Sequence, residues 1–296
     1  MDSDLYLSKA SQWLGGLRVA LPAHAAIIDA LAAAVALDEA LRWLEVGCSL
    51  GAGRADVFSD VDAAIGYRGI DTTAALDAAG IGVAHRSGHV VDLLTHTLPG
   101  SPEGVRRFAA EFDSGVQLDL VVFPAEWRTG LMEGTVGVVD KDGLFVRPIV
   151  STHAGPPTLD QAREWVMLGW WAVSDIAKFL QRGSLFEAAA RIDAVREQAL
   201  RLFAASGSIP YPEFGLTSLL DWPPFEVPGT LADTYCRPDD LTQVIAAAHA
   251  VVALHDMATH RAAAVLHFDL DTEWARTARG RLHQATTDDG TVSHIG

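Results

Sequence analysis

Two carboxylates that stand two residues apart are the first feature of this sequence able to do chemistry. They are Asp60 and Asp62, at the end of the segment Gly47–Asp62, which reads GCSLGAGRADVFSDVD. We expect both on one strand, where alternate residues point to the same face. Like charges so close would leave one carboxyl protonated unless a cation lay between them. Mg²⁺ prefers oxygen ligands and is usually held by one or two carboxylates with substrate phosphates, so the spacing predicts a divalent-metal site.

A third acid, Asp119, is expected from another strand of the same sheet. It lies between Leu118 and Leu120 in the apolar segment Gln117–Phe123, where an acid is costly unless it has a partner. With the first pair it could hold two metal ions, one activating an attacking hydroxyl and the other stabilising a triphosphate. Two other interpretations stay open. Asp119 could be an edge-strand acid that faces water, and the first two acids could lie on a polar surface turn.

The small residues before the acids predict a phosphate-binding turn. Ser49, Gly51 and Gly53 follow an apolar run that ends at Gly47. Backbone N–H groups of such a turn, with the Ser49 hydroxyl, would contact the phosphates of a nucleotide. Arg54 is either a further phosphate contact or a solvated loop residue.

These residues carry a family resemblance. The order Cys48-Ser49-Leu50-Gly51, followed by Phe58-Ser59-Asp60-Val61-Asp62, resembles the signature of the DNA polymerase β-like nucleotidyltransferase superfamily, a Gly-Ser after a strand and then Asp-x-Asp. The aromatic-Ser-Asp triplet is similar in particular to that of bacterial antibiotic nucleotidyltransferases. Cys48 departs from the pattern, because the family usually has glycine at this position.

The resemblance extends more loosely to a helical segment in the second half of the chain. The residues Trp170-Trp171, followed by Lys178-Phe179-Leu180-Gln181-Arg182-Gly183, are similar to the helical domain of aminoglycoside adenylyltransferases. This similarity implies that Lys178 and Arg182 meet the nucleotide phosphates. Relatives often supply a general base from a carboxylate that faces the metal site, which implies Glu164, with Asp175 as the alternative.

The resemblance implies an activity. It is the transfer of a nucleoside monophosphate, most simply AMP from ATP although another nucleoside triphosphate could serve, to a hydroxyl of a small molecule. Two Mg²⁺ ions would be the cofactors, and an aminoglycoside-type antibiotic would be the acceptor. The alternative is a nucleotidyltransferase of the toxin–antitoxin type, which modifies or binds a protein partner.

The charge of the chain bears on its partners. The net charge is −16, and the only lysines are Lys9, Lys141 and Lys178. A protein that grips a nucleic-acid backbone normally offers clustered Lys and Arg, so we expect no nucleic-acid partner. An acidic surface attracts small cations, which favours a cationic or polyhydroxylated acceptor, although the charge could also serve solubility alone.

Length and composition predict two domains of a cytoplasmic protein. The 296 residues, 49% of them hydrophobic, are too many for one small core. No apolar run approaches the roughly 20 residues that span a bilayer, and the N-terminus lacks the basic and apolar regions of a secretory signal, so no membrane partner is expected. The two cysteines, Cys48 and Cys236, suggest neither a disulfide framework nor a zinc cluster. Monomer and homodimer both stay open.

The expected fold class is α+β. Residues 1–150 should form a nucleotidyltransferase domain with a mixed sheet flanked by helices, and residues 151–296 an all-α helical bundle that binds the substrate. The break is placed at Ser151–Pro157, which contains two prolines and a glycine. The strands and helices expected on either side of it are a helix at Ala23–Leu41, strands at Trp43–Val46, Val61–Ile65, Val90–Leu94 and Gln117–Phe123, a short helix at Thr72–Ala79, a hairpin over Gly137–Ile149 turning at Lys141-Asp142-Gly143, and long helices at Leu159–Gln181, Leu185–Ala205 and Asp240–His260.

Three further groups of residues allow two interpretations each. On the expected helix Leu159–Gln181, acids, bases and Trp171 form one stripe, which either faces a cleft or is an ion-paired outer face. His85, His89, Asp92 and His96 could suggest zinc, but they lack a helical H-E-x-x-H frame, and the histidines are better interpreted as exposed loop residues. The acids and aromatics of Tyr211–Glu226 either line a pocket for a cationic ligand or pack a long loop.

Overall fold

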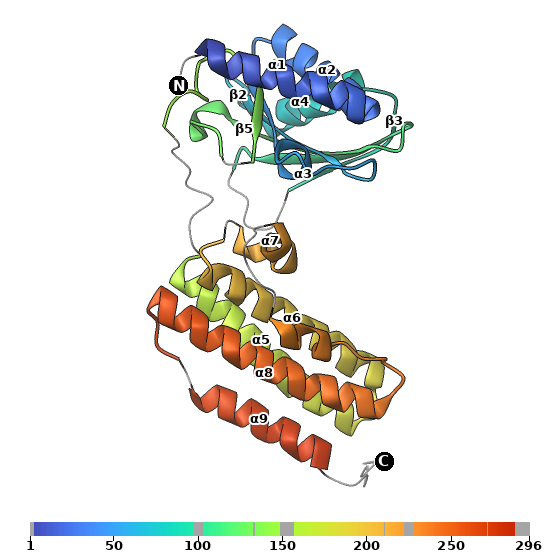
Figure 1. Ribbon diagram of the computed structural model, residues 1–296, viewed down its shortest axis with the longest axis vertical. Helices are drawn as coiled ribbons and strands as arrows, with labels where there is room; N and C mark the ends of the chain where they lie inside the picture. The colour runs from blue at the N-terminus through green and yellow to red at the C-terminus, as the bar shows by residue number, and fades with distance from the viewer. Residues whose placement is uncertain are drawn as a thin grey trace. The chain divides into compact units, whose positions relative to one another are not determined.

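The chain folds into two compact units in the computed structural model. The structure describes residues 3–97, 103–132, 134–148, 157–209, 211–221, 228–270 and 272–287. The first unit is Met1–Ser151 and the second is Thr152–Gly296 (Figure 1). The first is built on a mixed sheet and the second is helical in its described part, which confirms the expected α+β fold class. Residues 151–156, most of the expected break, lie outside the described residues.

Six strands form one sheet in the first unit. Their order is β3-β4-β5-β2-β1-β6. The central pair β2–β5 is parallel and every other neighbouring pair is antiparallel. The strands are β1 (Leu41–Val46), β2 (Val61–Tyr67), β3 (Val90–His96), β4 (Arg106–Phe112), β5 (Gln117–Pro124) and β6 (Val136–Asp140).

Helices cover one face of this sheet. The helices of the unit are α1 (Ser3–Ala20), α2 (Pro22–Leu37), the single turn α3 (Cys48–Gly51) and α4 (Thr73–Arg86). α2 and α4 pack on the strands, and Figure 1 shows them with α1 on one side of the sheet. The strands alternate, so that Leu44, Val61 and Leu118 are buried toward these helices. The residues between them point to the opposite side, here called the second face.

Four of the expected strands are confirmed, and the expected hairpin is wrong. β6 pairs with β1, but residues 144–148 form no strand. The Asp140 carboxylate accepts hydrogen bonds from the backbone N–H groups of Leu144 and Phe145, at 3.0 and 2.8 Å, which turns the chain aside. Both residues are then buried against Trp43 on the second face. Ile149, at the end of the expected hairpin, lies outside the described residues, and β4 and α1 were not expected.

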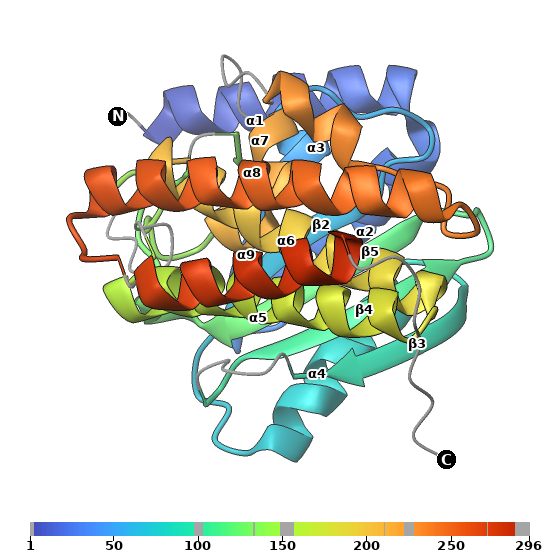
Figure 2. The same cartoon turned by 90° about the horizontal axis from the view of Figure 1, so that it is seen from below.

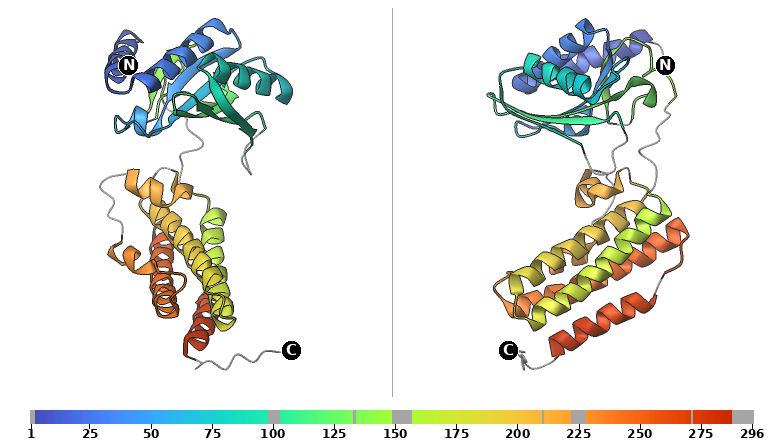
Figure 3. Two further views of the ribbon diagram at one scale, coloured as in Figure 1. Left: turned by 90° about the vertical axis from the view of Figure 1, so that its right-hand side faces the viewer. Right: turned by 180° about the vertical axis from the view of Figure 1, so that it is seen from behind.

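Four long helices make up most of the second unit. They are α5 (Leu159–Gln181), α6 (Leu185–Ser206), α8 (Leu241–Leu266) and α9 (Thr272–Thr287). Figures 2 and 3 show α5, α6 and α8 side by side, with α9 along α5. Thr158 starts α5 with a capping box, in which its side chain and that of Gln161 each accept a hydrogen bond from the other's backbone N–H. Three short pieces, η2 (Pro212–Phe214), α7 (Leu216–Asp221) and η3 (Gly229–Thr234), interrupt the expected long loop.

The helix α8 is more apolar than we expected of any segment. Its most apolar 18-residue window has a mean hydropathy of 1.3, which is enough by length and composition to cross a membrane. The apolar character of this helix was not predicted from the sequence, because the polar residues His249, His255, Asp256 and His260 interrupt it. Its buried residues, such as Val251 and Leu254, belong to the cores that α8 shares with α5 and α6, as in a core helix.

Candidate active site

The structure places Asp62 and Asp119 side by side. They are directly paired in the parallel ladder of β2 and β5. Val61 and Leu118, their neighbours in the chain, are buried against the helices, so both carboxylates lie on the second face. β5 is an interior strand, and the interpretation of Asp119 as an edge-strand acid is therefore wrong.

Asp60 completes a group of three carboxylates. It immediately precedes β2 and is exposed, whereas Asp62 is half-buried. Burial and the neighbouring charge of Asp60 raise the pKa of Asp62 to about 6, and Asp119 adds a smaller effect in the same direction. A hydrogen bond between the Asp60 and Asp62 side chains also raises this pKa. The two acids thus interact, as their spacing predicts, and one proton is retained nearly to neutral pH.

Arg107 of β4 holds the third carboxylate. Its Nη2 lies 2.5 Å from Asp119 Oδ2 in an ion pair between half-buried side chains. In the described part of the chain, Asp119 Oδ1 is buried without a hydrogen-bond partner. Arg107 was not predicted from the sequence, although alternation with the buried Phe108 and Ala110 places it on the second face.

The carboxylates of Asp60, Asp62 and Asp119 offer the type of donor atom that a divalent metal prefers. Three carboxylates supply hard oxygen donors. Oδ1 of Asp119 is an acceptor without a hydrogen-bond partner in the described part of the chain, and the raised pKa of Asp62 shows that its negative charge is not offset by a cationic side chain. Among the residues that the structure describes, no group of three His, Cys, Asp or Glu side chains is already arranged around a cation position. The donor set therefore fits Mg²⁺ chemically, and the side chains would have to adjust to hold it.

Two glycines shape the loop between β1 and β2 for reasons of space and backbone conformation. A Cβ at Gly51 would lie 2.3 Å from the carbonyl oxygen of Gly134, so only glycine fits there. Gly53 has a φ of +69°, in the left-handed region. Ser49 is half-buried in α3, while Arg54 is exposed. Contacts of this loop with a triphosphate stay a prediction.

Cys48 has a backbone conformation that glycine adopts freely. Its φ is +49°, which is uncommon for a residue with a side chain. The exposed thiol hydrogen-bonds to Asp62 and lowers the pKa of that carboxyl against the larger effects that raise it. The departure from glycine thus places a polar side chain directly on the carboxylate group.

A hollow on the second face adjoins the carboxylates. It has a volume of about 450 Å³, and we call it the sheet hollow. Asp60 and Asp119 line it with two further acids, Asp92 of β3 and Glu111 of β4, which are paired across the two strands. Arg107 is the arginine of its lining, which also includes His96. Its ionised groups are mainly negative.

The three histidines of the zinc pattern lie on different elements. His85 is exposed near the end of α4, and His96 is on β3, so the expectation of loop residues is wrong for both. His89 is exposed between α4 and β3, with its Nδ1 3.7 Å from Asp113 Oδ2.

A buried acid that was not predicted from the sequence lies on β1. Glu45 alternates with the helix-facing residues Leu44 and Val46 and is 3% exposed. Its Oε1 is 2.6 Å from Arg128 Nη1, and burial nevertheless raises its pKa to about 7. Its other oxygen, Oε2, is buried without a hydrogen-bond partner in the part of the chain that the structure describes.

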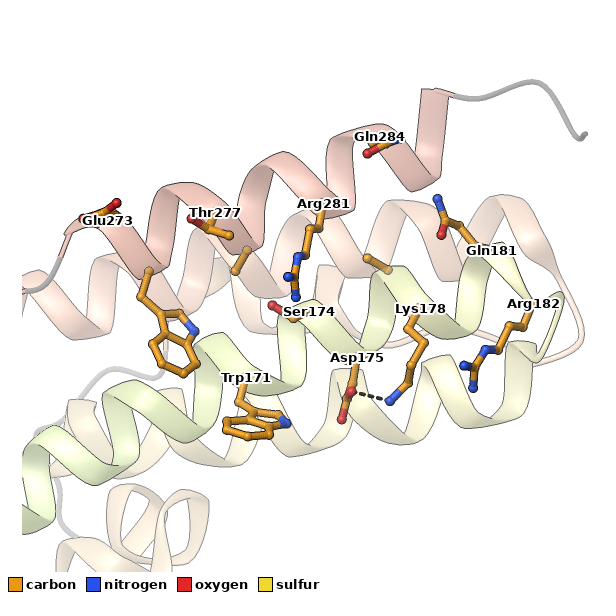
Figure 4. Close-up of a pocket in the computed structure, with 13 residues that line it drawn as sticks. Trp171, Ser174, Asp175, Lys178, Gln181, Arg182, Glu273, Thr277, Arg281 and Gln284 are labelled. Atoms are coloured by element: carbon orange, nitrogen blue, oxygen red, sulfur yellow. Dashed lines mark hydrogen bonds and ion pairs between the residues drawn. The ribbon is translucent and has the colours of Figure 1, made fainter. Parts of the chain in front are cut away.

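The predicted residues of the helical unit lie along α5. Glu164 is exposed, and its role as a base stays a prediction. Lys178 Nζ is 2.5 Å from Asp175 Oδ1, and both side chains line a pocket with Arg182 (Figure 4). The stripe is therefore both ion-paired and part of a pocket. Contacts of Lys178 and Arg182 with a nucleotide stay a prediction.

The acids and aromatics of the expected cationic pocket are only partly described. Glu213 is exposed, and its carbonyl oxygen accepts a hydrogen bond from Arg201 at 3.0 Å. Asp221 ends α7, while Trp222 and Glu226 lie outside the described residues. Pro212 is buried and η2 packs on α6, as the loop-packing interpretation expects.

Comparisons with known proteins add a distant likeness. No family model matches the chain, and no curated protein matches it. Among solved structures it is similar to an aminoglycoside 6-adenyltransferase from Bacillus subtilis, with 14% identity over 88% of this chain and 97% of that chain and a TM-score of 0.41. This likeness is too distant to assign an activity.

Proposed function

We propose that the chain is a metal-dependent nucleotidyltransferase that transfers a nucleoside monophosphate, AMP from ATP in the simplest case, to a hydroxyl of a small molecule. One observation carries the proposal. Asp60, Asp62 and Asp119 converge on one face of the sheet, next to the glycine loop, and leave negative charge uncompensated. A purely structural cluster would cost stability without return, because like charges oppose each other and burial opposes them all.

Each part of the site has a task in this reaction. Two Mg²⁺ ions bound by the three carboxylates would lower the pKa of the acceptor hydroxyl and offset the charge of the triphosphate. Arg107 offsets the charge of Asp119 when no metal is bound and competes with the metal for that carboxylate. The Ser49 hydroxyl would contact the phosphates, whereas the backbone N–H groups of Gly51, Ala52 and Gly53 already donate to carbonyl oxygens within the loop.

The sheet hollow indicates the class of acceptor. Asp92 and Glu111 line it in addition to the proposed metal ligands Asp60 and Asp119, so these two carboxylates attract a cation and offer acceptors for hydroxyl and ammonium donors. A polyhydroxylated amine such as an aminoglycoside has both kinds of group. Glu164 or Asp175, from the helical unit, remains the proposed general base.

The direct test measures pyrophosphate release with Mg²⁺, each of the four nucleoside triphosphates and a panel of aminoglycosides. We expect turnover with ATP, reduced at least about 100-fold by Asp60→Asn, Asp62→Asn or Asp119→Asn. The matched control is Asp113→Asn, an exposed acid of the β4–β5 turn that should leave activity unchanged. Full activity in the three site variants would remove the carboxylates from the reaction. Absence of turnover and of nucleotide binding with every combination would refute the proposed function.

A further inference from the structure

A large cavity lies wholly within the described part of the helical unit. It runs between α5 and α9 and has a volume of about 930 Å³. We call it the α5–α9 pocket. None of its lining residues comes from the first unit, so its shape does not depend on the carboxylate site. A cavity of this size can enclose much of a small molecule.

Two indole rings form one end of the α5–α9 pocket. Trp171 of α5 and Trp274 of α9 have ring centroids 6.0 Å apart and planes tilted by 34°. Trp171 is 56% exposed, although its large apolar ring favours burial. Two indoles that flank a cavity in this way offer faces on which a planar ring can stack.

Cationic side chains lie further along the same pocket. Figure 4 shows Arg281 pointing from α9 toward α5, with Lys178 on α5 and Arg182 at the C-cap of that helix. Lys178 shares its charge with Asp175, as described above. In the described part of the chain neither Arg182 nor Arg281 has an ion pair. Arg279, also on α9, does have one, with Asp256.

The local charge contrasts with that of the whole chain. Lys178, Arg182 and Arg281 face two acids, Asp175 and Glu273, in a protein whose net charge is −16. Arginine is the side chain best suited to bind carboxylate or phosphate oxygens through two parallel hydrogen bonds. The cationic part of the pocket is therefore selective for an anion.

We propose that the α5–α9 pocket binds a small molecule in which a planar aromatic ring is joined to an anionic group, carboxylate or phosphate. The ring stacks at Trp171 and Trp274, and the anion lies between Arg281 and the basic residues of α5. Trp171 and Lys178 are seven residues apart in α5, about 10 Å of helix, which matches a ligand with one ring system and one acidic group.

The experiment uses the full chain and titrates it with defined probes by calorimetry. Indole-3-acetate represents aromatic carboxylates and AMP represents nucleotides. Indole-3-acetamide, acetate and inorganic phosphate are the matched probes that lack either the charge or the ring. We expect at least one aromatic anion to bind measurably and its uncharged or ring-less counterpart to bind at least about tenfold more weakly. Binding of indole-3-acetate would identify a carboxylate ligand, and binding of AMP would identify a phosphate ligand.

Substitutions locate the binding. Arg281→Gln should weaken it about tenfold and Trp171→Ala roughly fivefold. Arg276→Gln removes the same charge from an exposed position of α9 that does not line the pocket, and should have no effect. All are surface substitutions, and thermal unfolding checks that each variant is folded.

The results separate this proposal from the proposed function. Asp62→Asn should leave probe binding unchanged. The proposal for the α5–α9 pocket would also stand if the protein released no pyrophosphate. The proposal is overturned if no aromatic anion binds, if the uncharged amide binds equally well, or if Arg281→Gln and Trp171→Ala bind like the wild type. Binding that Asp62→Asn abolishes and Arg281→Gln leaves intact would also overturn it.

Discussion

Asp62 of β2 and Asp119 of β5 face each other across the only parallel pair of strands in the described sheet. Parallel pairing places the two carboxylates on the same face and at the same level of the sheet. Arg107 compensates one of them, and the other keeps a pKa near 6. The protein thus holds concentrated negative charge at one point of its fold, and the following consequences can be measured.

Stabilisation by Mg²⁺ should depend on pH. Without metal, folded Asp62 binds more protons than unfolded Asp62 between its ordinary pKa near 4 and its folded pKa of about 6, so its contribution to stability falls as pH rises through this window. Mg²⁺ must displace that proton. We expect saturating Mg²⁺ to raise the melting temperature more at about pH 7.5 than at about pH 5. Differential scanning fluorimetry of wild type and Asp62→Asn would show it, and an equal shift at both pH values would contradict it.

Removal of Arg107 should tighten metal binding and weaken the metal-free fold. Arg107→Gln leaves Asp119 without its charge partner, at a cost of about 1 kcal/mol because both side chains are half-buried. The added negative potential should lower the dissociation constant for Mg²⁺ several-fold. The matched control is Arg106→Gln on the same strand, where the side chain pairs instead with Asp77 of α4. Weaker binding of Mg²⁺ by Arg107→Gln would show that the arginine supports the site rather than competing with metal.

Two substitutions of Cys48 should separate backbone strain from its thiol contact. Cys48→Gly removes both the left-handed strain at φ +49° and the hydrogen bond to Asp62. Cys48→Ala removes the hydrogen bond alone. We therefore expect the glycine variant to be more stable than the alanine variant by about 1 kcal/mol in urea unfolding. Equal stabilities would show that the conformation costs little here.

Buried His255 should make the helical unit sensitive to acid. Burial lowers its pKa from 6.5 to about 4, although its Nε2 lies 3.1 Å from the carbonyl oxygen of Val166. Between these values unfolded His255 binds more protons than folded His255, so stability is lost as pH falls from about 6.5 to about 4. His255→Leu should reduce this loss relative to His249→Leu, an exposed control on the same helix. The same acid sensitivity in both variants would contradict the assignment.

Close packing at Gly169 gives a prediction that does not depend on titration. A Cβ there would lie 2.2 Å from Cε1 of the buried His255 ring, which has little room to move. Gly169→Ala should destabilise the protein by about 2 kcal/mol. Gly280→Ala on α9, where no atom lies within 4 Å of the new Cβ, should stabilise it by about 0.5–1 kcal/mol. Urea unfolding of the two variants measures both effects.

The hairpin after β6 was predicted wrongly and the strand β4 was not predicted, for two different reasons. The Asp-Gly pair after β6 predicts a hairpin, but Asp140 caps the following backbone and the apolar residues beyond it fill the core around Trp43. β4 was missed because Arg106, Arg107 and Glu111 dilute its apolar pattern. Each of these charged residues is accommodated by strand alternation, with Arg106 on one face and the other two on the opposite face.

The sequence by itself determined the features that arise between residues close together in the chain. The apolar period predicted α5 from Leu159 to Gln181, and the two-residue spacing predicted the interaction of Asp60 with Asp62. The apolar neighbours of Asp119 also marked it as an acid that needs a partner. Such features follow from backbone geometry, which repeats within a few residues.

Only the tertiary structure decided which distant residues meet. Strand pairing set Asp119 beside Asp62 and brought Arg107 to Oδ2 of Asp119. The packing of α9 on α5 closed the pocket around Trp171. Register and helix packing are fixed by burial of the whole apolar surface at once. The charge balance of each site arises from that arrangement, because an electrostatic effect depends on distance in space rather than along the chain.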